Sequence, residues 1–533
     1  MSRDSCGRIC CRGLYSCYWK HPSERKRKCS CCWFGLVTVV SLLSLCWMYV
    51  CLTTFNDRED VNWKAFSILR RWVNWFLVLI ILSALLTVYF LLLLAFALFQ
   101  LALKEPLDLH CLHKAFLFVG VVFMALGATG ISILWKVEWH TVLLSLQATA
   151  PFLQMGGVGA LTLVSWVVFR GFHRARRTVS KIFVMAVFLG VSVAIFLSPL
   201  LIQSPCLMEP KQRLPPKPNL IGHRGAPMLA PENTLMSFQR STECGVIAFE
   251  TDVQLSKDGI PFLMHDHNSH FLIRTTDVLQ KFPGKDFSHS TNLTWDELKR
   301  LNAGDWFLTN DPFGSVSQLS EQEKETAGNQ TIPSLLQLLN LSRTHNISVI
   351  FDLKNHLEIN DTLNTAKTIL KSEIPQDLIL WLPSRHREDV RKIAPQFKQV
   401  YDRVSEMDRD GGDHLNLKYS ELRAAEIRSL RNRNVSVNLW VVNERWLFSL
   451  AWCSGASSVT TNACPLLKDM TSPDWTMETR TYMIIWITVD LGSLLIMFSL
   501  FIFQWWCYGH SEGKGKQRKE VSVWNRRELS PFL

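Results

Sequence analysis

The amino-acid sequence predicts a bundle of six membrane-spanning helices joined to a (β/α)₈ TIM barrel. Two observations predict this combination. Long apolar runs gather before residue 204 and again near the C-terminus, and each has about the 20 residues that a helix needs to cross a bilayer. Between them, residues 204–480 have the composition of a soluble domain and alternate strand-like with helix-like patterns, which is typical of α/β folds.

Six apolar stretches are long enough to span the lipid bilayer. The fourth contains Pro151, Gly156, Gly157 and Gly159, and membrane helices tolerate such residues when neighbouring groups satisfy the backbone. The first stretch is too long and too far from the N-terminus for a simple signal peptide. We therefore expect five spans within residues 33–203 and one final span, at 33–55, 76–103, 115–135, 143–169, 181–203 and 481–505.

The net charge of +11 is concentrated beside these spans. Basic residues cluster in 1–32, in 170–181 and from 508 onward, as is typical of cytoplasmic flanks. A nucleic-acid binder would instead carry a basic face on its folded domain. We therefore expect cytoplasmic tails at 1–32 and 506–533, an external domain at the plasma membrane and no nucleic-acid partner. The basic residues within 56–75 are an exception to this charge rule.

Glycosylation triplets support the external placement. They occur at Asn292, Asn329, Asn340, Asn346, Asn360 and Asn434, all between residues 204 and 480.

The cysteines fall into two groups. Seven of the fifteen lie in residues 1–32, where we expect acylation near the membrane, with free thiols or a zinc site as alternatives. Cys206, Cys244, Cys453 and Cys464 lie in the part expected outside. Oxidising surroundings favour disulfides there, and four cysteines allow three connectivities.

The soluble part begins with a linker at 204–218 that contains five prolines and is expected to be stiff. From 219 to 470, strand patterns such as 220–223, 246–253 and 348–353 alternate with helical ones. Repetition over about 250 residues predicts a (β/α)₈ barrel. Residues 267–332 do not follow the alternation, and we interpret them as an insertion.

Acidic side chains stand at the C-terminal ends of the predicted strands, where barrels of this kind hold their active sites. Glu250 and Asp252 are two positions apart on one strand, so they point the same way. Asp352 ends a later strand. Carboxylates aimed into one space repel one another unless a cation joins them, and hard dications such as Ca²⁺ or Mg²⁺ prefer oxygen ligands.

Basic side chains accompany these carboxylates. His223 and His265 titrate near neutral pH, so one can accept a proton while the other donates one. Arg224 and Lys354 can offset the charge of a phosphate. Each residue alone is more often an ordinary strand end or surface ion pair, but their joint appearance at successive strand ends favours phosphate chemistry.

A longer ordered pattern contains these residues. It consists of Leu220-Ile221-Gly222-His223-Arg224-Gly225-Ala226, Pro231-Glu232-Asn233-Thr234, Glu250-x-Asp252, Asp258-Gly259-x-Pro261, His265-Asp266, Arg274-Thr275-Thr276 and Val441-Val442-Asn443. The pattern resembles the glycerophosphodiester phosphodiesterase family over about residues 217–467, and the six-span layout resembles its vertebrate transmembrane members.

The resemblance implies a barrel that hydrolyses glycerophosphodiesters with a divalent metal. It implies Glu250, Asp252 and Asp352 as metal ligands, His223 and His265 as the acid/base pair, and Arg224 and Lys354 as phosphate contacts. Similar members act on glycerophosphoinositol, glycerophosphocholine or glycosylphosphatidylinositol anchors. The sequence does not choose among these substrates, nor between water and the glycerol 2-hydroxyl as the attacking group, and it does not give the preferred cation or the oligomeric state.

Three positions depart from the family pattern. Asp352 replaces the usual Glu, which shortens a metal ligand. Asn462 replaces an Asp near the barrel mouth. After Pro333-Ser334-Leu335, Leu336-Gln337 stands where the family usually has an acidic residue. These departures leave open a catalytically degenerate receptor or signalling scaffold that uses the barrel for binding. A transporter is a third alternative, but only Asp490 lies well inside a span, where we expect a hydrogen bond between helices.

Overall fold

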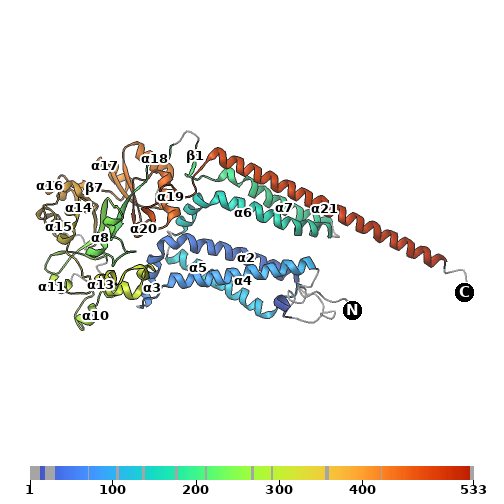
Figure 1. The fold of residues 1–533 in the computed structure, drawn as a ribbon, viewed down its shortest axis with the longest axis horizontal. Helices are drawn as coiled ribbons and strands as arrows, with labels where there is room; N and C mark the ends of the chain where they lie inside the picture. The colour runs from blue at the N-terminus through green and yellow to red at the C-terminus, as the bar shows by residue number, and fades with distance from the viewer. Residues whose placement is uncertain are drawn as a thin grey trace. The chain divides into compact units, whose positions relative to one another are not determined.

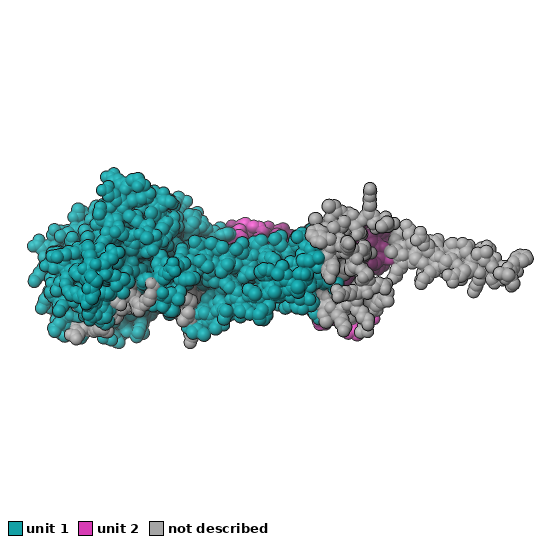
Figure 2. Space-filling model, turned by 90° about the horizontal axis from the view of Figure 1, so that it is seen from below, with its two compact units in different colours: residues 1–145, 214–476 teal, residues 146–213, 477–533 magenta. Residues whose placement is uncertain are grey.

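A computed structural model describes residues 13–17, 30–69, 71–103, 107–134, 138–174, 178–209, 213–265, 269–289, 292–354, 359–421 and 423–528. Most of the cysteine-rich tail predicted at 1–32, the end of the C-terminal tail and Asp266 lie outside these residues. The chain divides into two compact units, Met1–Ser145 with Leu214–Thr476, and Leu146–Arg213 with Met477–Leu533, which are coloured separately in Figure 2.

Six helical stretches in the described residues are long and apolar enough to cross a membrane, as predicted. They are Cys32–Leu69, Trp75–Leu101, Cys111–Ile133, Trp139–His173, Lys181–Leu201 and Thr479–Tyr508. The first extends beyond the predicted end at 55. Helix α2 (Ser30–Thr53) is followed by the 3₁₀ turn η1 (Thr54–Asp57) and by α3 (Arg58–Leu69), so most of the loop expected at 56–75 is helical.

In the first unit, α2 packs with α4 (Trp75–Leu103) and α5 (Cys111–Leu134) (Figure 1). Ser41 Oγ in α2 donates a hydrogen bond to the carbonyl oxygen of Phe90 in α4 at 3.0 Å. A Cβ added to Gly120 of α5 would lie 2.3 Å from the ring of Phe90. Small residues therefore let these helices approach closely, which is how helices associate in lipid.

The second unit contains most of α6 (Glu138–Arg174), with α7 (Thr178–Leu197), η2 (Ser198–Leu201) and the long α21 (Thr479–Glu528). Strands β1 (Leu207–Met208) and β11 (Met477–Glu478) form a parallel pair here. Gln154 donates a hydrogen bond to Asp490 Oδ1 at 3.2 Å. Asp490 thus makes the helix–helix hydrogen bond expected of it, and Pro151 lies within a continuous α6.

Parallel strands of the described chain form the predicted barrel, in the spatial order β7-β6-β5-β3-β2-β10-β9-β8. A parallel bridge between Tyr401 and Leu415 brings the two ends of this order together. The strands are β2 (Asn219–His223), β3 (Ala248–Leu255), β5 (Ser348–Leu353), β6 (Ile379–Trp381), β7 (Lys398–Gln399), β8 (His414–Lys418), β9 (Ser436–Trp440) and β10 (Ser458–Thr461), while β4 (Pro261–Leu263) pairs antiparallel with β3.

Helices connect the strands and surround the barrel (Figure 1). They are α8 (Leu235–Glu243), α14 (Leu335–His345), α15 (Ile359–Lys371), η5 (Gln376–Leu378), α16 (Arg387–Ile393), α17 (Val404–Asp410), α18 (Ala424–Asn432), α19 (Arg445–Ser454) and α20 (Cys464–Leu467). Short helices lie between β4 and α14: α9 (Ser269–Thr275), α10 (Val278–Lys281), α11 (Trp295–Leu298), α12 (Asp305–Asn310), η4 (Val316–Gln318) and α13 (Glu321–Gly328).

Alternation along the strands separates an outer from an inner layer of side chains. Phe249 and Phe351 belong to the large core that includes residues of the surrounding helices, whereas Ile221, Ala248 and Ile350 form a small cluster of their own. The side chains two positions further along each of these strands point to the same inner face as the small cluster. They are polar, so the inner face changes from apolar to polar toward the C-terminal ends of the strands. This change creates the candidate site.

Candidate active site

The seven side chains predicted to form the site line one pocket. Its volume is about 350 Å³, and its walls include His223, Arg224, Glu250, Asp252, His265, Asp352 and Lys354. Strand register explains why they meet, because His223 pairs with Glu250 across β2 and β3, and Asp252 pairs with Asp352 across β3 and β5.

A tight turn after β2 presents His223 and Arg224. A Cβ on Gly222 would lie 2.6 Å from the carbonyl oxygen of Gly225, and Gly225 has a φ of +88°, a conformation that glycine adopts without strain. Arg224 itself has a φ of 52°, and its backbone N–H donates to Glu250 Oε2 at 3.1 Å. Gly222 and Gly225 are therefore geometric requirements of this turn.

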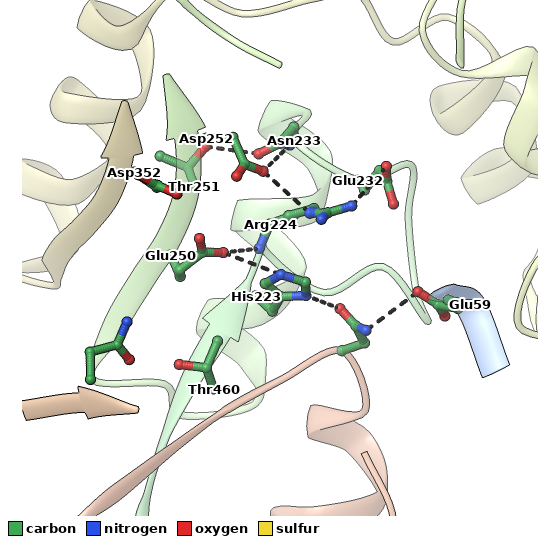
Figure 3. A network of polar contacts seen from close by, with 12 residues as sticks. Glu59, His223, Arg224, Glu232, Asn233, Glu250, Thr251, Asp252, Asp352 and Thr460 are labelled. Carbon is green, nitrogen blue, oxygen red and sulfur yellow. Dashed lines mark hydrogen bonds and ion pairs between the residues drawn. The ribbon is translucent and has the colours of Figure 1, made fainter. Parts of the chain in front are cut away.

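The Arg224 guanidinium holds carboxylates. Its Nε lies 3.2 Å from Asp252 Oδ2, and its Nη1 lies 3.3 Å from Glu232 Oε1 (Figure 3). Burial opposes the charge, but the carboxylates of Glu232 and Asp252 dominate and raise the pKa of Arg224. Asp252 Oδ2 also accepts a hydrogen bond from Asn233 at 3.2 Å. Arg224, predicted to contact phosphate, thus serves in this structure as the centre of an acidic cluster.

Lys354 stands between two of the predicted metal ligands. Its Nζ lies 3.1 Å from Asp252 Oδ1 and 3.0 Å from Asp352 Oδ2. Burial works against the ammonium charge, yet the two carboxylates raise the pKa of Lys354. Burial also works against the Asp252 carboxylate, but Lys354 and the neighbouring basic groups lower its pKa. Glu250 differs, because burial and the nearby Asp252 charge raise its pKa.

His223 lies in the wall of the pocket, between Asn462 and Glu250. Its Nδ1 is 2.6 Å from Asn462 Oδ1, and its Nε2 is 3.8 Å from Glu250 Oε2. Burial, together with the Arg224 charge, lowers the pKa of His223 to about 3. The imidazole is therefore neutral near pH 7. His265 follows β4 and lines the same pocket.

The three carboxylates predicted to bind a metal lie in the wall of one pocket. In the described part of the chain, no group of three or more His, Cys, Asp or Glu side chains is gathered closely enough to hold a metal ion. The carboxylates are paired with Lys354 and Arg224 instead. Glu250, Asp252 and Asp352 nevertheless line one pocket, and their oxygen atoms are the ligands that Ca²⁺ and Mg²⁺ prefer. These residues fit a hard dication by chemistry and location, in competition with the Lys354 ammonium.

Residues of η1 and α3, which follow α2, also reach the site. Asn56, Glu59, Asp60 and Trp63 line a second pocket of about 110 Å³, which shares His223, Arg224 and His265 with the first. These residues were not predicted from the sequence, because contacts between residues nearly four hundred positions apart leave no local pattern. The only available signal was a group of acidic and aromatic residues directly after an apolar stretch.

The predicted glycosylation sites differ in their exposure. Asn329, Asn340, Asn346, Asn360 and Asn434 are exposed, whereas Asn292 is half-buried. Asn292 donates a hydrogen bond to Asp286 Oδ2 at 3.0 Å. Five of the six sites are therefore open to modification as the structure stands.

Comparisons with known proteins cover both the barrel and the membrane helices. Residues 223–465 match the profile of the Glycerophosphoryl diester phosphodiesterase family. The chain is 44% identical over 507 residues to the glycerophosphoinositol inositolphosphodiesterase GDPD2 of Mus musculus, with 93% of each chain covered. It is 44% identical over 503 residues to GDPD2 of Homo sapiens, again with 93% of each covered.

Another relative is glycerophosphodiester phosphodiesterase domain-containing protein 5 of Homo sapiens. It is 40% identical over 535 residues, which cover 97% of this chain and 87% of that protein. Likeness on this scale extends far beyond the site residues.

Proposed function

Because the chain belongs to the glycerophosphoryl diester phosphodiesterase family and is a glycerophosphodiester phosphodiesterase, we propose that glycerophosphoinositol is its substrate and that a divalent cation is its cofactor. The relatives that are 44% identical carry a glycerophosphoinositol activity in their names. One observation carries the proposal: a single pocket is lined by three carboxylates, two cationic side chains and two histidines.

Each residue that lines the pocket has a separate role in hydrolysis in this proposal. The neutral His223 accepts the proton of the attacking hydroxyl, and His265 donates a proton to the departing oxygen, since both line the pocket. Lys354 and Arg224 offset the charge of the phosphodiester. Glu250, Asp252 and Asp352 would hold the cation, which when bound supplies positive charge to the phosphoryl oxygens. The shorter Asp352 side chain still lines the pocket, which supports retention of activity.

In this proposal, the barrel lies on the outer face of the plasma membrane. The exposed glycosylation triplets and the Cys244–Cys464 disulfide support this placement, because disulfides persist in oxidising compartments. Treatment of intact cells with a glycosidase tests it. A mobility shift of the full chain is expected, and a chain that lacks glycans and stays inaccessible to an impermeant label would exclude the outer location.

Activity is tested with the purified full chain in lipid nanodiscs. We expect Mg²⁺ or Ca²⁺ to support hydrolysis of glycerophosphoinositol, a chelator to abolish it, and the same cation to restore it. Mass spectrometry of the products identifies which ester bond breaks. Glycerophosphocholine and release of a glycosylphosphatidylinositol-anchored reporter serve as comparison substrates. Faster turnover of either comparison substrate would reject glycerophosphoinositol, and full activity in chelator would reject the cation.

A further inference from the structure

Residues 56–59, here called the first-loop segment, are bound to the loops at the mouth of the barrel. Asn56 Oδ1 accepts a hydrogen bond from the backbone N–H of Asn443 at 2.8 Å, and Asn56 Nδ2 donates to the carbonyl oxygen of Val441 at 2.9 Å. Arg58 pairs with Glu444 at 3.2 Å. Both partners of every contact lie in the first compact unit, so the first-loop segment is part of the wall around the site.

A chain of hydrogen bonds leads from this segment to His223. Asn462 Nδ2 donates to Glu59 Oε2 at 3.4 Å, and Asn462 Oδ1 lies 2.6 Å from His223 Nδ1. Figure 3 shows Glu59 and His223 joined through this one intervening side chain. The Asn462 backbone N–H also donates to Asn443 Oδ1 at 2.9 Å. Asn462 is therefore held from two sides while its amide faces the imidazole.

The donor and acceptor roles along this chain follow from elementary chemistry. Glu59 Oε2 accepts a hydrogen bond from the NH₂ group of Asn462, so Glu59 keeps that group on its own side. The amide oxygen then faces His223, and because it only accepts hydrogen bonds, the imidazole proton lies on Nδ1. Nε2, which faces the pocket beside Glu250, is left with the lone pair that a proton acceptor needs.

The second oxygen of Glu59 provides an independent observation. Among the described residues, the buried Glu59 Oε1 has no hydrogen-bond partner. A buried carboxylate oxygen without a partner destabilises the fold. Placement of this carboxylate is thus poorly explained by stability alone, and it lies within the second pocket beside His223.

We propose that Glu59 is a positioning residue for the reaction: acting through Asn462, it selects the His223 tautomer whose Nε2 accepts the proton. The membrane-anchored segment thereby completes the active site of the barrel. This inference rests on the proposed role of His223, but it does not depend on which glycerophosphodiester is the substrate. Without Glu59 the Asn462 amide is free to turn, which presents its NH₂ group to Nδ1 and places the proton on Nε2.

The test uses the full chain in nanodiscs with Mg²⁺ or Ca²⁺. Glu59→Leu is expected to lower kcat on the order of tenfold to a hundredfold, at or below the lower end of what a general acid or base contributes, because Glu59 acts through Asn462. KM should change less than about twofold. Glu59→Gln, whose side-chain oxygen still accepts from Asn462, is expected to recover most of the lost rate. In an Asn462→Ala background, Glu59→Leu should have little further effect, because residues that act through one another are not additive.

Glu444→Gln is the matched control, because it removes a different carboxylate that ties the first-loop segment to the barrel. It should leave kcat within about twofold of the wild type. Equal losses in Glu444→Gln and Glu59→Leu would overturn the proposal in favour of simple anchoring. So would additive effects of Glu59→Leu and Asn462→Ala, or a loss confined to KM.

The experiment distinguishes an error in the role given to Glu59 from an error in the proposed substrate. Rates are measured on glycerophosphoinositol, glycerophosphocholine and bis(p-nitrophenyl) phosphate. A wild type inactive on the first compound rejects the proposed substrate, while the ratio of variant to wild-type kcat on a compound that is turned over still decides the role of Glu59.

Discussion

Lys354 and Asp352, two positions apart at the end of β5, form an ion pair with 3.0 Å between Nζ and Oδ2. The same ammonium lies 3.1 Å from Asp252 Oδ1. Lys354 therefore bridges two carboxylates in the wall of the pocket. An ammonium and a dication compete for the same oxygen atoms, so this lysine links cation affinity to phosphate binding.

Replacement of Lys354 by Gln should separate these two effects. We expect the apparent Kd for Mg²⁺ or Ca²⁺ to fall, because the competing charge is gone. We also expect kcat/KM to fall on the order of a hundredfold, because a charge-assisted contact to the phosphodiester is lost. Calorimetric titration and steady-state kinetics measure the two quantities. Lys371→Gln, on the exposed surface of α15, is the control, and weaker cation binding in Lys354→Gln would contradict the competition.

Replacement of His265 by Ala tests the assigned proton donor. Hydrolysis should fall on the order of a hundredfold to ten-thousandfold, the usual contribution of a general acid or base. Cation affinity should change little, because the carboxylates remain. His345→Ala, at an exposed position at the end of α14, is the matched control. Unchanged turnover in His265→Ala would remove this residue from the mechanism.

The sequence predicted the inner face of the barrel better than its surroundings. Glu250 and Asp252 obey the two-residue period of a strand, and the end of β5 brings Asp352 beside them. The pairing of Lys354 with these carboxylates was not predicted, because a strand-end pattern gives the location of a charge but not its partner. Glu59 and Asn56 were missed altogether, since contact with residues such as Val441 depends on how membrane helices and barrel pack.

Arg274 illustrates the same kind of long-range packing. Its guanidinium lies 4.8 Å from the ring centre of Trp63 and 4.9 Å from that of Trp306, and its Nη2 lies 2.8 Å from Glu232 Oε1. Arg274→Met should lower the free energy of unfolding by about 2 kcal/mol, because Glu232 loses one of two buried cationic partners and keeps Arg224. Arg274→Lys should lower the free energy of unfolding by a smaller amount. An ammonium can still pair with Glu232, but it lacks the planar face that stacks on aromatic rings.

Thermal unfolding of the full chain measures both variants. The exposed Arg300, replaced by Met, is the control for a change of surface charge. If Arg274→Lys were as stable as the wild type, the stacking on tryptophan would have no energetic role and only the ion pair would matter.

The Cys244–Cys464 disulfide joins the end of α8 to the start of α20, across a sequence separation of 220 residues. Closure of so long a loop restricts the unfolded chain, and loss of a native disulfide costs roughly 2–5 kcal/mol. The double variant Cys244→Ser, Cys464→Ser should therefore have a lower Tm than the wild type. Cys507→Ser removes a free, exposed cysteine and should leave Tm unchanged. An equal Tm for the double variant and the wild type would mean that this bond does not form.

Asp258 gives the fold a predictable dependence on pH. Its Oδ1 accepts hydrogen bonds from Ser256 Oγ at 2.7 Å and from the Trp295 backbone N–H at 2.8 Å, and these bonds lower the pKa of Asp258. A carboxyl group whose pKa is lower in the folded state stabilises the fold above its ordinary pKa of about 3.9 and loses this contribution as the pH falls through the folded value.

Asp258→Asn keeps an oxygen acceptor but cannot ionise, so its deficit in Tm against the wild type should be constant near neutral pH and shrink below about pH 4. Asp377→Asn, at an exposed position of η5, provides the comparison for a surface charge change. Thermal unfolding from about pH 7 to about pH 3 measures the two differences. A deficit for Asp258→Asn that grew as the pH fell would mean that the carboxyl is protonated in the native fold, and that these two hydrogen bonds do not hold α11 to the barrel through charge.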